Sequence, residues 1–227
     1  MGRIVCVANQ KGGVGKTTTA SNVAAGLAKA GMQTLLVDLD PQCNATTGLG
    51  GIPAETHPLV SEAALGENVV STAVTNLSLL PGSRSVRDVE RIAEQARAGS
   101  MVLSNHLSCG LNAWDYCLID CPPSLGELTR TALAGSTEVL MPIQCEYFAL
   151  EGLTQMIEVI RDVMADQPGR LSFSGIVLTM HDANLELTTE VEQEVRDFFG
   201  EIVFDTVIPR DVAVSEAPSH ALSVLDY

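Results

Sequence analysis

The stretch NQKGGVGKTTT, residues 9–19, constrains the possible folds of this chain more than any other part of it. It follows RIVCVA (3–8), a continuous apolar run typical of a strand that is buried on both faces. It leads into KTTTASNVAAGLAKAG (16–31), where apolar residues recur at helical spacing before a glycine. A strand, a glycine-rich loop and a helix, in this order, are the surroundings that a phosphate-binding loop requires. The stretch therefore predicts an α/β protein that binds a nucleotide.

The residue types in this loop suit a nucleoside triphosphate. Its glycines let backbone N–H groups converge on phosphate oxygens, and the N-terminus of the following helix favours negative charge. Lys16 is expected to reach the terminal phosphates, Thr17 to ligate Mg²⁺ and Thr18 to donate to the α-phosphate. The loop residues predicted to bind the nucleotide are Lys11, Gly12, Gly13, Val14, Gly15, Lys16, Thr17 and Thr18.

The first part of the loop departs from the common pattern. That pattern has a glycine five residues before the Gly-Lys-Thr sequence, and this chain has Gln10 there. Lys11 follows, so the loop carries a second lysine. The common pattern holds its triphosphate with one lysine, so Lys11 needs a separate explanation.

Two further strand-like segments carry carboxylates near their ends. Asp38 and Asp40 end QTLLVDLD (33–40), and Asp120 follows the apolar part of YCLIDCPPS (116–124). Open α/β sheets bind their ligands at the carboxyl ends of the strands. We therefore expect Asp120 to hold Mg²⁺ through its water shell and Asp40 to position or activate the attacking water, with capping of a helix or turn by Asp38 or Asp40 as the alternative. The residues predicted to hold the metal are Thr17, Asp40 and Asp120.

The remaining segments alternate between strand-like and helix-like patterns. Further strands are expected over 76–82, 138–144, 171–180 and 201–209, and helices over 86–109, 149–166 and 186–199. Alternation of this kind predicts a doubly wound, mostly parallel sheet with helices on both faces. Because no linker or repeat is visible, residues 1–227 are expected to form a single domain, in which the glycine- and threonine-rich stretch 43–56 is a mobile loop.

Composition argues against some classes of protein. No run approaches the roughly 18 apolar residues that a membrane helix needs, and the first residues do not resemble a signal peptide. The six cysteines include no Cys-x-x-Cys pair. This pattern favours buried free thiols in a reducing cytoplasm over a metal or iron–sulfur site.

Several longer motifs resemble one family. KGGVGKTTTASNVAAGLA and LLVDLDPQCNATTGLG are similar to the deviant Walker ATPases of the ParA/Soj/MinD group. YCLIDCPPSLGELT, PIQCEYFALEGL and VIPRDVAVSEAPSH resemble the ParA/Soj branch in particular, and the similarity extends over essentially the whole chain. The resemblance implies the P-loop ATPase fold of this group, ATP or ADP with Mg²⁺ as cofactors, and slow ATP hydrolysis as a switch in chromosome or plasmid partitioning.

The resemblance also offers an explanation for the second lysine. In this family two subunits enclose two ATP molecules, and each subunit contributes the extra lysine to the nucleotide of its partner. Lys11 is then the lysine that acts in trans, and Lys16 the one that acts in cis. Gly12 must stay small because the partner approaches closely there. The implied catalytic residues are Lys11, Lys16 and Asp40.

Other roles implied by the resemblance lie further along the chain. The segment that packs near adenine in the family corresponds to Pro209, Arg210 and Asp211, where Asp211 replaces a common asparagine. Glu146 and Glu216 match acids of family motifs, and either could equally cap a helix or form a salt bridge. Family members usually continue past SVLDY into one more helix, whereas this sequence ends at Tyr227, so the domain is expected to be without that helix, either by truncation or by natural shortening.

The second half of the chain differs from the family at positions where family members bind DNA. ParA/Soj proteins bind DNA without sequence preference through basic residues, and this chain has Asn184, Leu185 and Ala213 where arginines are common. Residues 1–113 carry 8 basic and 8 acidic residues, whereas residues 114–227 carry 5 basic and 20 acidic residues. The affinity for DNA comes mostly from Lys and Arg side chains at the phosphates. DNA binding therefore stays open, and it depends on whether the remaining arginines cluster in space.

Four functions stay open at this point. The first is a partitioning ATPase that forms an ATP-dependent homodimer, responds to a ParB-like activator and lies in the cytoplasm or on the nucleoid, without a membrane partner. The second is the same switch acting on a protein cargo instead of DNA, which the missing arginines favour. The third is a redox or metal-transfer ATPase, and the fourth a biosynthetic ligase of related fold, such as a dethiobiotin or cobyrinate-amidating enzyme.

Overall fold

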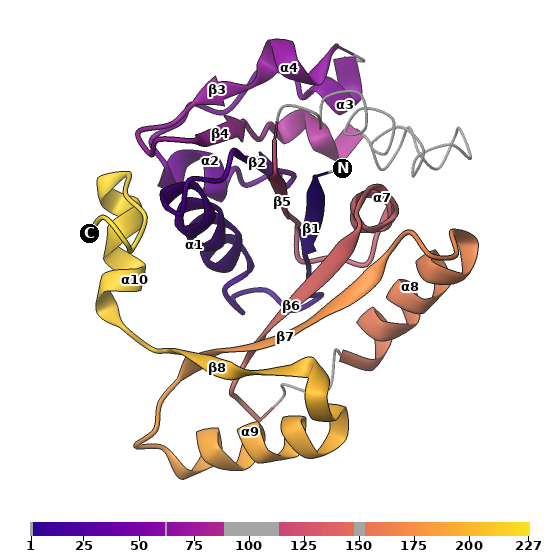
Figure 1. The fold of residues 1–227 in the computed structure, drawn as a ribbon, viewed down its shortest axis with the longest axis vertical. Helices are drawn as coiled ribbons and strands as arrows, with labels where there is room; N and C mark the ends of the chain where they lie inside the picture. Colours follow the sequence, from indigo (N-terminus) through magenta and orange to yellow (C-terminus); the bar gives the residue numbers. More distant parts are fainter. Residues whose placement is uncertain (1, 62, 89–113, 148–152) are drawn as a thin grey trace.

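The computed structural model describes residues 2–61, 63–88, 114–147 and 153–227, which form one eight-stranded sheet with its helices (Figure 1). The strand order is β3-β4-β2-β5-β1-β6-β7-β8, and every adjacent pair is parallel except β3 with β4. The strands are β1 Arg3–Val7, β2 Thr34–Asp38, β3 Val70–Ser71, β4 Leu77–Leu80, β5 Tyr116–Asp120, β6 Glu138–Gln144, β7 Ser172–His181 and β8 Val203–Pro209.

The described helices follow most of the strands in turn. The α-helices are α1 Lys16–Lys29, α2 Asn44–Gly48, α3 Pro58–Ser61, α4 Leu65–Asn68, α7 Glu127–Gly135, α8 Leu153–Asp166, α9 Glu186–Phe199 and α10 Val212–Glu216. Short 3-10 helices are η1 Arg84–Val86, η3 Gly200–Ile202 and η4 Ala217–His220. The expected fold class, a mostly parallel α/β sheet, is confirmed.

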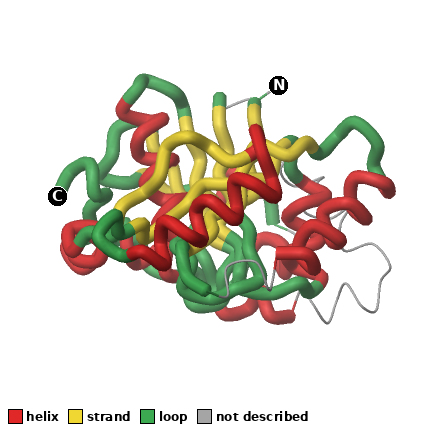
Figure 2. The backbone as a smooth tube through the Cα atoms, turned by 90° about the horizontal axis from the view of Figure 1, so that it is seen from below, coloured by secondary structure: helices red, strands yellow, loops and turns green. Residues whose placement is uncertain are grey.

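Helices cover both faces of the sheet, as the view from below shows (Figure 2). Alternate residues of a strand point to opposite faces, so Val5 and Val7 of β1 pack on the side of α1, whereas Ile4 and Cys6 pack on the side of α7, α8 and α9. The α1 residues buried against the sheet share a short side chain that lets the helix approach closely: Ala20, Ala24, Ala25 and Ala28.

The carboxyl ends of β1, β2 and β5 lie side by side. β5 pairs in parallel with both other strands, and Asp120 is in register with Val7 of β1 and with Asp38 of β2. The loop that follows β1 is therefore next to the acidic residues that end β2 and β5. The sheet topology alone brings together segments that are about 80 to 110 residues apart in the sequence.

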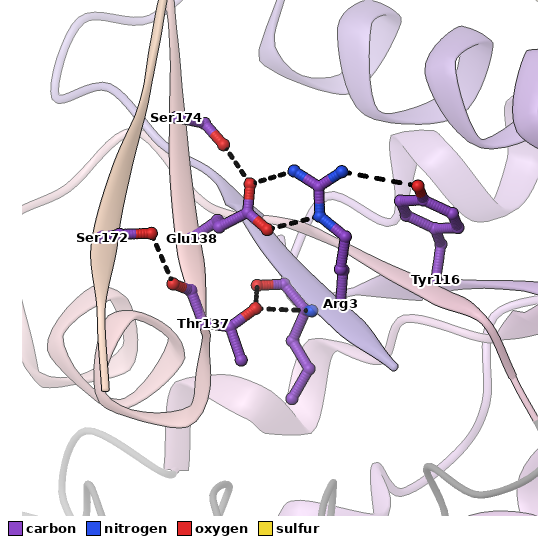
Figure 3. Close-up of polar contacts among 7 residues, drawn as sticks. Arg3, Tyr116, Thr137, Glu138, Ser172 and Ser174 are labelled. Atoms are coloured by element: carbon purple, nitrogen blue, oxygen red, sulfur yellow. Dashed lines mark hydrogen bonds and ion pairs between the residues drawn. The ribbon is translucent and has the colours of Figure 1, made fainter. Parts of the chain in front are cut away.

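A polar network ties the opposite end of the sheet (Figure 3). Arg3, the first residue of β1, donates from Nε to the carboxylate of Glu138 at the start of β6, at 2.6 Å, and also from a terminal guanidinium nitrogen. The other terminal nitrogen donates to the Tyr116 hydroxyl of β5 at 3.4 Å. The Ser174 hydroxyl of β7 donates to Glu138 as well, so one carboxylate links neighbouring strands.

The structure departs from the expected elements in several places, since β3, α3, α4, α7 and α10 lie where no element was predicted. The stretch 43–56, expected to be a loop throughout, contains helix α2, so that prediction is wrong for residues 44–48. The reason is tertiary: the backbone N–H and the hydroxyl of Thr46 both donate to Asp38 at the end of β2. The helix expected over 86–109 falls almost entirely on residues outside the described part of the chain, as do residues 149–152 of the next expected helix.

The described cysteines are buried and free, as expected: Cys6, Cys43, Cys117, Cys121 and Cys145. Among the described helices, none combines the length and the apolar character that crossing a bilayer requires.

Candidate nucleotide-binding site

The connection between β1 and α1 has the backbone of a phosphate-binding loop. Gly13 and Gly15 have φ values of 76° and 86°, in the left-handed region that glycine adopts without strain. Gly15 directly precedes α1, so the free N–H groups of the first helical turn face the loop. The predicted nucleotide-binding residues lie on this connection or in the first turn of α1: Lys11, Gly12, Gly13, Val14, Gly15, Lys16, Thr17 and Thr18.

Hydrogen bonds to the neighbouring strands β6 and β7 anchor the loop. Asn9 is almost fully buried; its Nδ2 donates to the Pro142 carbonyl of β6 at 2.8 Å, and its Oδ1 accepts from the Lys11 N–H at 3.0 Å. The Thr179 hydroxyl of β7 donates to the Val14 carbonyl at 2.9 Å. Neither Asn9 nor Thr179 was predicted, and the one signal for Asn9 is a polar residue directly after a buried strand.

Lys16 is buried inside the loop. Its exposed fraction is 6%, and its ammonium donates to the Lys11 carbonyl at 2.8 Å. Burial lowers the pKa of Lys16, while Asp120, Cys121 and Asp40 act in the opposite direction. An ammonium has three protons to donate, so Lys16 can still donate hydrogen bonds to phosphate oxygens. A buried positive charge without a negative partner is costly, which favours binding of an anion at this place.

Asp120 ends β5 between β1 and β2 and is completely buried. Among the described residues, neither oxygen of its carboxylate has a hydrogen-bond partner in normal geometry. Burial raises the pKa of Asp120 well above its usual range, and the charge of Asp38 adds to this effect. The Thr17 hydroxyl and the Lys16 ammonium act in the opposite direction. A buried carboxylate without partners beside a hydroxyl fits Mg²⁺, which takes oxygen ligands, so these residues suit the expected metal.

Asp40 lies two residues beyond β2 and is 6% exposed. Its Oδ1 accepts from the Gln42 N–H at 2.8 Å, so one carboxylate oxygen closes a turn. The charge of Asp40 raises the pKa of both Lys16 and Asp120. The structure thus brings Asp40, Lys16 and Asp120 to one place, and it also gives Asp40 the turn-closing contact that was the alternative.

Asp38 is engaged inside the fold. Its carboxylate accepts from the N–H and hydroxyl of Thr46 and from the Asp40 N–H. Burial raises the pKa of Asp38 to about 6, although these hydrogen bonds lower it. By accepting from an N–H group in α2, Asp38 stabilises that short helix, which agrees with the capping alternative.

Lys11 lies at the surface, in contrast to Lys16. Its side chain is 35% exposed, and its ammonium is 3.9 Å from the carboxylate of Glu146. Glu146 is also 3.8 Å from the guanidinium of Arg210, so this acid is a salt-bridge partner of two cations. The two lysines of one loop therefore have opposite environments.

The segment expected near adenine lies beside the loop. Pro209, Arg210 and Asp211 line a cavity of about 800 Å³ that extends to Gly15. The Asp211 carboxylate accepts from the Ala213 N–H at 2.8 Å and so caps α10. The other motif acid, Glu216 of α10, accepts a hydrogen bond from the hydroxyl of Tyr227 at 2.9 Å, which ties it to the end of the described chain.

Comparison with known proteins shows the family of this chain. Residues 2–173 match a family model described as an AAA domain. The chain is 46% identical over 231 residues to the chromosome-partitioning ATPase Soj of Treponema pallidum, covering 100% of this chain and 90% of that protein. It is 43% identical over 232 residues to the chromosome partitioning protein ParA of Caulobacter vibrioides, covering 99% of this chain and 87% of that protein.

A solved structure has the same fold with a nucleotide bound. Cobyrinic acid a,c-diamide synthase of Mycobacterium smegmatis, with bound ATP analog and magnesium, has a TM-score of 0.88 at 32% identity and covers 97% of this chain and 93% of that chain. A ligase of related fold was one of the alternatives, but the identity to Soj and ParA is higher over the same length. The chain therefore belongs to the Soj/ParA family of chromosome-partitioning ATPases.

Proposed function

We propose that this chain acts as one ATPase domain that forms a sandwich homodimer with ATP and returns to monomers after hydrolysis, as a switch in chromosome or plasmid partitioning. The observation that carries the proposal is the opposite placement of the two loop lysines. Lys16 is buried under its own loop, whereas Lys11 lies at the surface beside it. We infer that the buried lysine serves the nucleotide of its own chain and that the surface lysine, whose ammonium lies 3.9 Å from Glu146, exchanges this contact for the nucleotide of a partner.

Binding of ATP in this proposal relies on groups that are already in place. The backbone N–H groups of the glycine-rich loop and of the first turn of α1 hold the phosphates, and Lys16 neutralises their charge. The base occupies the end of the 800 Å³ cavity lined by Pro209, Arg210 and Asp211. The residues that would hold magnesium are Thr17, Asp120 and Asp40, and bound magnesium neutralises charge on the phosphate oxygens.

Hydrolysis in this proposal needs two further groups. Asp40 orients the attacking water with the carboxylate oxygen that does not accept from Gln42. Lys11 of the partner subunit neutralises negative charge that develops during transfer, as an arginine finger does in other nucleotide hydrolases. Because the second group arrives only with a partner, hydrolysis is slow in the monomer and the ATP-bound dimer persists long enough to act as a switch.

Substitution of each of the three lysines tests this proposal. Lys16→Ala is expected to lower ATP affinity by at least about tenfold, because it removes the buried cation from the loop. Lys11→Ala should keep ATP affinity and lose the ATP-dependent dimer. The measurements are titration with a fluorescent ATP analogue and light scattering after gel filtration, each with Mg²⁺, in an Asp40→Ala background that slows turnover.

The remaining lysine gives a matched control. Lys29 pairs with Asp226 at the far end of α1, so Lys29→Ala should change neither ATP affinity nor dimerisation. A Lys11→Ala protein that dimerises as strongly as its parent would refute the trans role. A Lys16→Ala protein with unchanged ATP affinity would refute the assignment of the loop itself.

A second candidate keeps the same switch but replaces DNA by a protein cargo. It is favoured by the pairing of most described cations with carboxylates: Arg3–Glu138, Lys11–Glu146, Lys29–Asp226, Arg130–Asp162, Arg196–Glu192 and Arg210–Glu146. Asn184 and Leu185 stand directly before α9, where the family often has arginine. In both candidates we propose a cytoplasmic protein whose hydrolysis is stimulated by a ParB-like or cargo-bound activator.

A further inference from the structure

We infer that the Thr46 hydroxyl is a positioning group for hydrolysis, because through Asp38 it holds the backbone that carries Asp40. The inference rests on the proposed role of Asp40 and goes beyond it, since it names residues outside the proposed nucleotide-binding and metal-binding residues. Nothing in the sequence motif points to Thr46, which falls in a stretch expected to be a loop. The inference follows from a set of buried hydrogen bonds that meet at one carboxylate.

Four hydrogen bonds converge on Asp38 and Thr46. The Thr46 hydroxyl donates to Asp38 Oδ2 at 2.6 Å, and the Thr46 N–H donates to the same oxygen at 2.8 Å. The other oxygen, Asp38 Oδ1, accepts from the Asp40 N–H at 3.2 Å. The Thr46 hydroxyl in turn accepts from the Gly82 N–H at 2.8 Å. One carboxylate and one hydroxyl thus join the end of β2, helix α2 and the segment after β4.

The residues of this cluster are buried and closely packed. Asp38 and Thr46 are completely buried, so water does not replace a lost hydrogen bond easily. A Cβ added at Gly82 would lie 2.8 Å from the Asp38 carboxylate carbon and 2.9 Å from Oδ2, closer than real contacts allow. The Asp38 carboxylate therefore occupies the space that a side chain at residue 82 would need.

The position of Asp40 depends on this cluster. Its N–H is held by Asp38, and its own carboxylate accepts only from the nearby Gln42 N–H among the described contacts, within the same short turn. The orientation of the free Asp40 oxygen therefore follows the backbone at residues 38–42. A shift of about 1 Å in a catalytic group is enough to lower a rate about a hundredfold, so loss of the Thr46 hydroxyl should slow hydrolysis without removing any group from the nucleotide.

The test compares two isosteric changes in one helix. Thr46→Val removes the buried hydroxyl and keeps the shape of the side chain. We expect it to lower kcat for ATP by about tenfold or more, with KM for ATP and the ATP-dependent dimer changed by less than about twofold. Thr46→Ser keeps the hydroxyl and should restore most of kcat. Thr47→Val makes the same change at the next residue of α2, which is exposed, and should leave kcat as in the wild type.

A second variant and a reference variant make the result decisive. Circular dichroism shows whether Thr46→Val folds. If it does not, Gly82→Ala takes its place, because the added methyl group displaces the Asp38 carboxylate and should lower kcat in the same way. Asp40→Ala supplies the reference for the proposed function. Full turnover by Asp40→Ala would overturn the role of Asp40. If Asp40→Ala is inactive while folded Thr46→Val and folded Gly82→Ala both keep the wild-type kcat, only the positioning inference is overturned.

Discussion

Lys16 and Asp120 are opposite charges held out of water at the same end of the sheet. Each is costly to bury, and each lacks the full set of partners that a buried charge normally has: Lys16 donates to a carbonyl, and neither Asp120 oxygen has a hydrogen bond among the described residues. A phosphate and a magnesium ion would satisfy both groups at once. At the residue scale, the site is therefore built for ligands at the expense of stability in their absence.

Asp120→Asn tests this relation between function and stability. Because burial raises the pKa of Asp120, the folded protein binds that proton more tightly than the unfolded chain does. The contribution of Asp120 to stability is therefore present at low pH and is lost as the pH rises through the folded pKa. We expect the unfolding free energy of the variant, relative to that of the wild type, to increase by about 1–3 kcal/mol as the pH is raised from 4 to 8. The measurement is urea unfolding with EDTA and without nucleotide.

The same variant has a second expected result. It should lose the magnesium dependence of ATP binding, because an amide is a weaker ligand than a carboxylate for this ion. A relative stability of the two proteins that does not change between pH 4 and pH 8 would show that Asp120 is not a destabilising buried carboxyl group. Unchanged magnesium dependence would remove Asp120 from the metal site.

At the scale of the elements, the two ends of the strands have different tasks. The carboxyl ends of β1, β2 and β5 carry the loop and the acids of the site, while the opposite end carries the network of Arg3 and Glu138 (Figures 1 and 3). This network links β1 to β6 with two hydrogen bonds from one guanidinium. It joins the central strands at the end opposite to the loop.

Glu138→Gln tests the contribution of this network. Its hydrogen bonds with Arg3 hold the pKa of Glu138 below the usual value of 4.5. A carboxylate of this kind stabilises the fold above its unfolded pKa, and the contribution is lost as the pH falls through the folded pKa. We expect the variant to lose about 1 kcal/mol of unfolding free energy at pH 7 and much less near pH 3, by urea unfolding.

A control for this change is an exposed carboxylate elsewhere in the chain. Glu55→Gln removes the same charge at a solvent-exposed position and should alter the unfolding free energy by less than about 0.5 kcal/mol at either pH. An effect of Glu138→Gln that is the same at pH 7 and pH 3 would mean that packing, and not the ion pair, is what the glutamate contributes.

At the scale of the whole molecule, the excess negative charge lies in one half of the chain. The net charge of −15 comes from residues 114–227, and α9 within them has exposed acids along its length. Arg196 of the same helix is engaged with Glu192 and with the backbone carbonyls of Phe204 and Asp205. Few described cations in this half are therefore left to contact phosphates.

We expect weak and strongly salt-dependent binding to DNA. The Asp40→Ala protein with ATP and Mg²⁺ should bind a labelled random duplex at about 50 mM salt and lose it by about 200 mM, because nonspecific affinity depends on the number of phosphate contacts. The measurement is fluorescence anisotropy, with ADP as the control. ATP-dependent binding that persists at the higher salt would contradict this and would support a basic patch formed by the dimer.

Local patterns made much of the fold and the site predictable. The loop motif marked Lys16 and Thr17, and the alternation of strands and helices marked the sheet that is observed. Asp120 could be placed near the loop because parallel strands present their carboxyl ends at one edge. Asn9 and Thr179 could not be found this way, since their partners Pro142 and Val14 are more than 130 residues away in the sequence.

The sequence by itself determined the kind of fold, the loop and the family, because each depends on residues close together in the chain. Only the tertiary structure decided that β5 lies between β1 and β2, that Lys16 is buried while Lys11 is partly exposed, and that residues 44–48 form a helix. Each of these depends on contacts between distant segments. A threonine in a glycine-rich stretch has weak local preferences, and the buried carboxylate of Asp38 fixes its conformation.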